Sequence, residues 1–418
     1  MPASYLAIWI FFALSITLML VRPRGISEVW WVAGGAIALV VLRLISPGEA
    51  MRAVSKGSDV YLFLAGMMLL AQLAQAHGVF DWLAAIAVEH ARGSRVRLFS
   101  LIYVFGALVT IFLSNDATAV VLTPAVLVSV KKAKADPLPY LLVCAFIANA
   151  ASFVLPIANP ANLVVFHAAM PPLARWFGMF LAPSVVSIGA TYLALRWCCR
   201  KNLRGEMTVD VERVHLSSAG KHTLAGLAVV AGVLLAASAM GKDLGMPTFI
   251  TAVCIAGALS VKEQANPLAL VKGISWSVLP LVAGLFVLVE ALSGAGASRL
   301  CQSALVELQR WPQAGGALAA SFAVGVGTNF VNNLPLGLIA GASVAAAHVE
   351  GLLRSAVLIG VDLGPNLSVT GSLATILWLI EIRKEDVHVS AWTFFKAGLI
   401  VMPFALVLAT LAAVYLRW

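Results

Sequence analysis

Apolar runs of about 17 to 25 residues, the length that crosses the hydrocarbon core of a bilayer as an α-helix, recur along nearly the whole chain. Of its 418 residues, 61% are hydrophobic and only 11% are charged. A soluble domain cannot bury so much apolar surface, so the bilayer is the natural solvent for this chain. The sequence therefore predicts an all-α polytopic membrane protein with about ten spans.

The remaining composition excludes several other classes of protein. The first run, Ser4 to Val21, lacks a basic leader and a small-residue cleavage site, so we expect a retained span. The net charge of +9 comes from Lys and Arg residues in short loops, which predicts membrane topology rather than nucleic-acid binding. The five cysteines show no paired metal-ligand spacing, and the sequence predicts neither a metal site nor a cofactor.

An internal repeat divides the chain into two similar halves. Three residues of the first half recur as the same residue type 218 positions later: Gly66 at 284, Gly78 at 296 and Asn115 at 333. Further on the offset becomes 213, because the segment 149–159 aligns with 362–372. A shared offset across several landmarks indicates duplication of one structural unit.

Each half is predicted to contain a helical hairpin and one long interrupted helix. The first repeat covers 1–197, with its hairpin at about 97–131 and its broken helix at about 138–170. A linker follows at 198–222. The second repeat covers 223–418, with its hairpin at about 313–349 and its broken helix at about 351–381.

The distribution of basic residues predicts the orientation of the halves. Arginines at 92, 95 and 97 precede the first hairpin, and lysines at 131, 132 and 134 follow it, so both of its ends should lie on the cytoplasmic side. The hairpin then enters and leaves without crossing. Each half has five true spans, an odd number, and the second half is inverted relative to the first. We expect an inner-membrane protein with a cytoplasmic linker and both termini outside.

Short polar residues interrupt the apolar sequence at four places: the two hairpin turns and the two helix breaks. Broken backbone at membrane depth is tolerated where it lines a cavity or is buried in protein. Entering from opposite faces, the two turns can meet the two breaks and form a binding site for a small polar solute. The predicted substrate-binding residues are Asn115, Asp116, Thr118, Asn159, Asn162, Asn332, Asn333, Asn366 and Ser372.

Asp116 and Asp362 are the two acidic residues of this group, and a carboxylate inside a membrane is costly. Burial favours the neutral form of a carboxyl group, which suits a proton carrier. Each half supplies one of them, so either could carry the coupling proton. Asp116 could instead cap a helix, the asparagines could only satisfy backbone groups, and Glu290 could form an interhelical hydrogen bond or serve as another protonation site.

Two segments resemble the ArsB-type arsenite permeases of the ion transporter superfamily: Ser114-Asn-Asp-Ala-Thr-Ala-Val-Val-Leu-Thr-Pro124, and Gly360-Val-Asp-Leu-Gly-Pro365 followed by 371–378. The resemblance extends over essentially the whole chain. It implies efflux of arsenite and antimonite, which are neutral trivalent hydroxides, in exchange for protons. The resemblance also implies a possible partner, a soluble arsenite-stimulated ATPase that assists in some systems. Arsenous acid needs hydrogen-bonding groups rather than an arginine clamp.

No Arg or Lys occurs in the turns or breaks, which argues against a di- or tricarboxylate substrate. Cys198-Cys199 is a vicinal pair, but it lies at the end of a span without a third cysteine beside it.

A sodium/proton antiporter of the same superfamily is the nearest alternative. An aspartyl protease that uses Asp116 and Asp362 would need signatures that are missing here, and a passive channel would not need paired carboxylates.

Overall fold

The computed structural model describes residues 3–166, 170–207, 215–263, 267–349 and 351–416, and within these ranges every regular element is helical. In the part of the chain that the structure describes, eight helices are long and apolar enough to cross a membrane. They are α1 (Ala3–Val21), α4 (Ser58–Ala76), α6 (Arg95–Phe112), α11 (Leu173–Cys198), α12 (Ser218–Ala239), α13 (Gly245–Lys262), α17 (Gln313–Val331) and α21 (Ala391–Tyr415). A ninth candidate is the pair α15 (Val278–Gly294) and α16 (Ala297–Gln309), which is bent by 73°. The all-helical polytopic prediction is confirmed.

The expected ten spans and these nine candidates are not the same set of segments. The first arms of both predicted hairpins, α6 and α17, are among the nine. The predicted broken helices are absent from that set because each is divided into short pieces: α9 (Leu138–Ala150) with α10 (Pro160–Phe166), and α19 (Leu352–Leu363) with α20 (Leu373–Lys384). Helix α2 (Glu28–Val41) is also short, with 14 residues.

The order of elements in α1–α11 recurs in α12–α21. In both cases a short helix that starts with proline follows the first two helices: α3 (Pro47–Lys56) precedes α4, and α14 (Pro267–Gly273) precedes α15. A turn then leads into α5 (Val79–Ala91) and into α16. The glycine before each of these two helices has a positive φ, 69° at Gly78 and 104° at Gly296. Glycine adopts this left-handed conformation at little cost, which explains the repeated glycine at this turn.

The two halves interlock through matched glycines. Helix α4 packs along α13, and α15 packs along α2. A Cβ atom on Gly66 would lie 2.9 Å from the backbone carbonyl of Thr248, and one on Gly284 would lie 2.9 Å from Cγ1 of Val32. Each glycine therefore permits the close approach of a helix from the other half.

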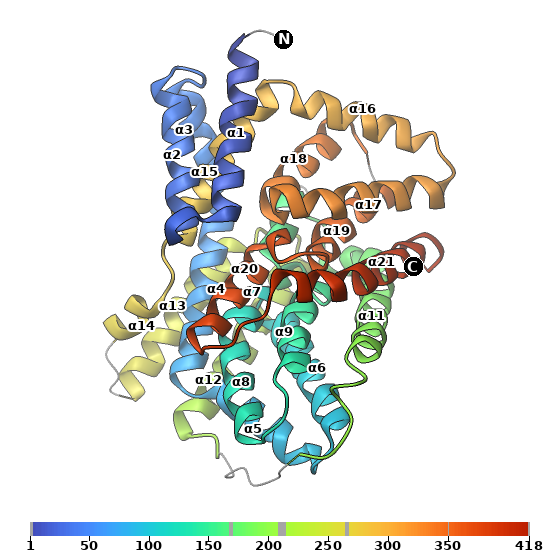
Figure 1. Cartoon of the computed structure of the whole chain (residues 1–418). Helices are drawn as coiled ribbons and strands as arrows, with labels where there is room; N and C mark the ends of the chain where they lie inside the picture. Colours follow the sequence, from blue (N-terminus) through green and yellow to red (C-terminus); the bar gives the residue numbers. More distant parts are fainter. Residues whose placement is uncertain (1–2, 167–169, 208–214, 264–266, 350, 417–418) are drawn as a thin grey trace.

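The first hairpin lies in the lower part of the view and the second in the upper part (Figure 1). The first consists of α6, the short helix α7 (Asn115–Ala117), the π-helix η2 (Thr118–Leu122) and α8 (Thr123–Lys132). Pro124, which has no N–H, follows the wide turn of η2. The second consists of α17 and α18 (Asn333–Ala346), joined at Asn332 with a φ of 77°.

The helix bounds refine the predicted segments. The hairpin predicted at 97–131 spans 95–132, and the one predicted at 313–349 ends its second helix at Ala346. Helix α12 begins at Ser218, inside the predicted linker 198–222, because Ser217 caps its N-terminus. Residues 208–214 of that linker, and 167–169 at the end of the predicted broken helix 138–170, lie outside the described residues.

Candidate functional site

The two helix breaks satisfy their freed carbonyl groups in the same way. In the first break, which includes the 3-10 turn η3 (Pro156–Ala158), Asn162 Nδ2 donates to the carbonyls of Ser152 at 2.8 Å and of Pro156 at 3.3 Å. In the second, which includes the 3-10 turns η5 (Gly364–Asn366) and η6 (Val369–Gly371), Thr375 Oγ1 donates to the carbonyl of Val369 at 2.8 Å. The donors Asn162 and Thr375 are equivalent positions of the repeat, 213 residues apart, and so are the acceptors Pro156 and Val369. Internal donors are required here because hydrocarbon supplies none.

Side chains of the two breaks also bond to each other across the halves. Asn159 Nδ2 donates to Oδ1 of Asp362 at 2.7 Å, and at the equivalent position Ser372 Oγ donates to Oδ1 of Asn149 at 3.4 Å. Asn149 Nδ2 in turn donates to Oδ1 of Asn366 at 3.0 Å. All five side chains are buried. Oδ2 of Asp362 has no hydrogen-bond partner among the residues that the structure describes.

The second hairpin turn is fastened to the second break through Asn329. Its Nδ2 donates to the carbonyl of Gly364 at 3.1 Å, and its Oδ1 accepts from Ser368 Oγ at 2.7 Å. Thr370 Oγ1 donates to the backbone carbonyl of Asn329 at 2.9 Å. Asn332 Nδ2 donates to the carbonyl of Thr370 at 3.2 Å. The turn and the break therefore form one hydrogen-bonded unit.

A small cavity of about 10 Å³, with room for about one water molecule, lies where the turns and breaks meet. Residues of both hairpin turns, both broken helices, α4 and α15 line it. Equivalent positions of the two halves, such as Asn115 with Asn333 and Asp116 with Leu334, face the same space. We call this the central cavity; its polar lining residues are Asn115, Asp116, Asn159 and Asn333.

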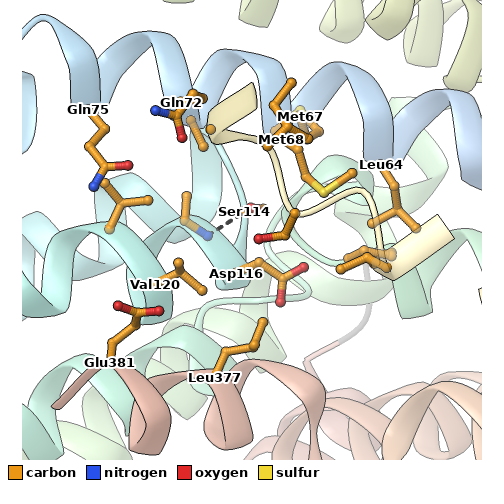
Figure 2. Close-up of a pocket in the computed structure, with 18 of the residues that line it drawn as sticks. Leu64, Met67, Met68, Gln72, Gln75, Ser114, Asp116, Val120, Leu377 and Glu381 are labelled. Carbon is orange, nitrogen blue, oxygen red and sulfur yellow. Dashed lines mark hydrogen bonds between the residues drawn. The ribbon is translucent and has the colours of Figure 1, made fainter. Parts of the chain in front are cut away.

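A larger cavity of about 250 Å³ adjoins the central cavity on one side, between α4, the first hairpin turn and α20. We call it the α20 cavity. Figure 2 shows the Asp116 carboxylate pointing into this space, with Gln72 and Gln75 of α4 on one side and Glu381 of α20 on the other. The two cavities share the lining residues Leu64, Asp116, Pro160 and Val278. Asp116 is therefore accessible from the α20 cavity.

A cavity of about 290 Å³ occupies the equivalent place in the other half, between the start of α4, α10 and α18. We call it the α10 cavity. Its lining residues Val60, Val164 and Leu338 correspond to Val278, Leu377 and Val120 of the α20 cavity. None of the four polar residues of the central cavity lines it. Among the described residues, the central cavity shares lining residues with the α20 cavity and none with the α10 cavity.

The predicted site residues separate into two groups. Asn115, Asp116, Asn159 and Asn333 line the central cavity. The others are buried and form hydrogen bonds with neighbouring protein groups: Thr118 with Thr110, Asn332 with Thr370, Asn162 with Ser152, Asn366 with Phe146, and Ser372 with Asn149. Asp362 contacts Asn159, a residue of the central cavity, but lines none of the three cavities itself.

Sequence reasoning did not include Gln75, Glu381 or Asn329 among the site residues. Gln75 and Glu381 lie near the ends of apolar helices, where polar residues are common, and only the tertiary fold places α4 and α20 around one cavity. Asn329 stands in the second turn, and its spacing from Asn332 and Asn333 is a signal that could have found it. Glu290 pairs with Lys56 at 2.8 Å, away from all the residues of the central cavity.

The central cavity carries amide and carboxyl groups but no basic side chain. Lys384 lines the far part of the α20 cavity, where it pairs with Glu381 at 2.7 Å. Within the described ranges, no group of three or more His, Cys, Asp or Glu side chains could hold a metal ion. Where the central cavity adjoins the larger α20 cavity, its amide and carboxyl groups can bind a small solute by hydrogen bonds, and Asp116 can exchange a proton with the α20 cavity.

Broken helices, hairpins and a central polar site within a polytopic helical fold define a membrane transporter rather than an enzyme. The chain belongs to the citrate transporter (CitMHS) family, whose model matches residues 9–361. It is a multi-span membrane protein of that family, as the spans above require.

Among its relatives is the arsenical pump membrane protein of Yersinia enterocolitica, which is 27% identical over 97% of both chains. The arsenical pump membrane protein of Escherichia coli K12 is 25% identical, again over 97% of both chains. The resemblance to arsenite permeases seen in the sequence is thus confirmed.

A solved structure of the YdaH transporter of Alcanivorax borkumensis, described as having an unusual topology, has a similar fold. The TM-score is 0.57 and the sequence identity is 15%, and the match covers 99% of this chain and 98% of that one.

Proposed function

We propose that this chain is a secondary efflux transporter that exports arsenite and antimonite from the cytoplasm in exchange for protons. The observation that carries the proposal is the similarity to arsenical pump membrane proteins over 97% of both chains. The central cavity supports it, because its amide and carboxyl groups suit a neutral trihydroxide that donates and accepts hydrogen bonds.

The description of the matched family as citrate transporters raises the question of a carboxylate substrate. Citrate carries three carboxylates, and proteins bind such anions with Arg or Lys side chains. No such side chain lines the central cavity, and Asp116 would repel an anion there. The lining thus favours a neutral solute over citrate for this chain.

In this proposal the coupling proton is carried by Asp116, with Asp362 in a supporting role. Asp116 lines both the central and the α20 cavity, so substrate and proton can compete for one place. Asp362 is buried behind Asn159 and can respond to the site through that hydrogen bond. Arsenous acid would bind where the two cavities join, with Asn115, Asn159 and Asn333 as hydrogen-bond partners. Its binding from the cytoplasm would release the proton inward.

The α20 cavity would face the cytoplasm. The end of α20 carries Arg383 and Lys384, and Lys131 at the end of the first hairpin donates to the carbonyl of Glu385. By the positive-inside rule this end would lie inside, together with the linker, and both chain termini would lie outside. Alternating access would then close the α20 cavity and open the α10 cavity to the central site.

Everted membrane vesicles test the proposal, because their lumen corresponds to the outside. We expect arsenite uptake when the lumen is acidic and no ATP is present, and loss of that uptake on addition of a protonophore. Asp116→Asn should abolish the gradient-driven uptake. Antimonite should compete with arsenite.

Correctly inserted protein that takes up no arsenite would show that the substrate is wrong. Proton release from the lumen on addition of Na⁺ would then favour the sodium/proton antiporter. Uptake that requires both ATP and a co-expressed soluble ATPase would contradict a purely proton-driven mechanism and favour a pump assembly.

A further inference from the structure

A cavity of about 450 Å³ lies far from the central site, where the end of α11 meets the starts of α9 and α21. Three basic side chains line it: Arg200 and Lys201, which follow α11, and Lys396 of α21. None of the described residues that line it is acidic. Leu138, Leu142 and Ile400 form its apolar part. The cavity thus combines positive charge with an apolar wall.

The three cations lack an acidic partner within the part of the chain that the structure describes. Among the described residues, none of them takes part in an ion pair. The nearby carboxylate of Asp136 is already engaged, since it accepts from Asn202 Nδ2 at 2.6 Å and from the backbone N–H of Leu138 at 3.1 Å. Lys384, by contrast, pairs with Glu381. The positive charge of the cavity is therefore available to an external anion.

Two tryptophans hold two of these cations at the cavity. The guanidinium of Arg200 lies 4.6 Å from the ring centroid of Trp197, and Nζ of Lys396 lies 5.4 Å from that of Trp392. Both rings are more than half exposed, Trp197 at 55% and Trp392 at 59%. Exposed tryptophan at helix ends is typical of the membrane–water interface. The cavity therefore lies at the depth of lipid headgroups.

From this arrangement we propose that the cavity binds the phosphodiester headgroup of an anionic phospholipid. Arg200, Lys201 and Lys396 contact the phosphate, and an acyl chain follows Leu142 and Ile400 toward the hydrocarbon. Basic pockets between membrane helices on the cytoplasmic side bind acidic headgroups by the same physics. Because α11 ends the first half and α21 ends the second, the bound lipid joins the two halves.

The test uses the full chain purified in mild detergent and native mass spectrometry. Phosphatidylglycerol and phosphatidylcholine with identical acyl chains are added at equal concentrations. We expect selective retention of phosphatidylglycerol. The variant Arg200→Gln/Lys201→Gln/Lys396→Gln should bind phosphatidylglycerol at least tenfold more weakly, since each interfacial charge contributes severalfold to the affinity. Lys396→Arg should retain it.

The matched control is Arg97→Gln/Lys132→Gln/Lys221→Gln, which removes three exposed cations predicted to lie on the same membrane side. It should keep the lipid. Equal loss in the control, or equal retention of phosphatidylcholine, would overturn the proposal. Competition by inorganic phosphate as effective as that by the lipid would also overturn it, since the ligand would then be a soluble anion. Both triple variants carry surface substitutions, and thermal unfolding verifies that they fold.

Discussion

Asn159 donates a 2.7 Å hydrogen bond to Asp362, and this bond joins the two helix breaks across the two halves of the chain. Its equivalent in the repeat runs in the other direction, from Ser372 to Asn149, and is longer at 3.4 Å. Both are buried. The repeat thus provides the same link twice, but only one of the two contains a carboxyl group.

The Asn159–Asp362 bond should contribute to stability. Asn159→Ala removes the donor to Oδ1 of the buried Asp362 carboxyl group, whose Oδ2 already lacks a partner among the described residues. We expect the free energy of unfolding to fall by about 1 to 3 kcal/mol. Asp362→Asn should cost less, since an amide oxygen can still accept the bond. Denaturant unfolding of the solubilised protein measures both. If the losses from Asn159→Ala and Asp362→Ala simply add in the double variant, the two side chains are not coupled.

The two large cavities should be open to opposite sides of the membrane. In a cysteine-free background, Gln75→Cys places a thiol in the α20 cavity and Ser55→Cys places one in the α10 cavity. Both positions are exposed. We expect an impermeant maleimide to label the first only from the cytoplasmic side and the second only from the outer side. Labelling of both from one side would refute the inverted arrangement.

The matched glycines between the halves should not tolerate even a methyl group. Gly66→Ala would bring Cβ to 2.9 Å from the Thr248 backbone, and Gly284→Ala would bring it to 2.9 Å from Val32. We expect each substitution to destabilise the protein by about 1 to 3 kcal/mol through overpacking. Gly232→Ala is the control, because no atom lies within 4 Å of its Cβ position. Equal melting temperatures for all three variants would contradict this packing.

Asn329 should hold the second helix break in place. Asn329→Ala removes the hydrogen bonds to Gly364 and Ser368, so the break loses two of its hydrogen bonds to the hairpin. We expect faster amide hydrogen exchange in residues 364–372 and weaker transport. Ser368→Ala removes only one of these hydrogen bonds and should have a smaller effect. Unchanged exchange in both variants would mean that the break is held by other contacts.

Several features of this protein follow from the sequence alone. The apolar runs determine a membrane fold, because no soluble core could bury them. The offsets of 218 and 213 identify matched positions, and the structure shows why they match: Gly66 and Gly284 are both contact points between halves, and Gly78 and Gly296 both have positive φ. These signals are local or periodic, so a linear sequence displays them.

Which polar residues face a cavity was decided by the tertiary structure. In the sequence, the asparagines of the hairpin turns and helix breaks cannot be distinguished. In the structure Asn115 and Asn159 line the central cavity, whereas Asn162 and Asn366 donate to backbone carbonyls. Likewise, Asp116 lies in the cavity while Asp362 lies behind Asn159. The difference depends on how hairpins and breaks from distant parts of the chain pack together, and only a folded chain specifies that packing.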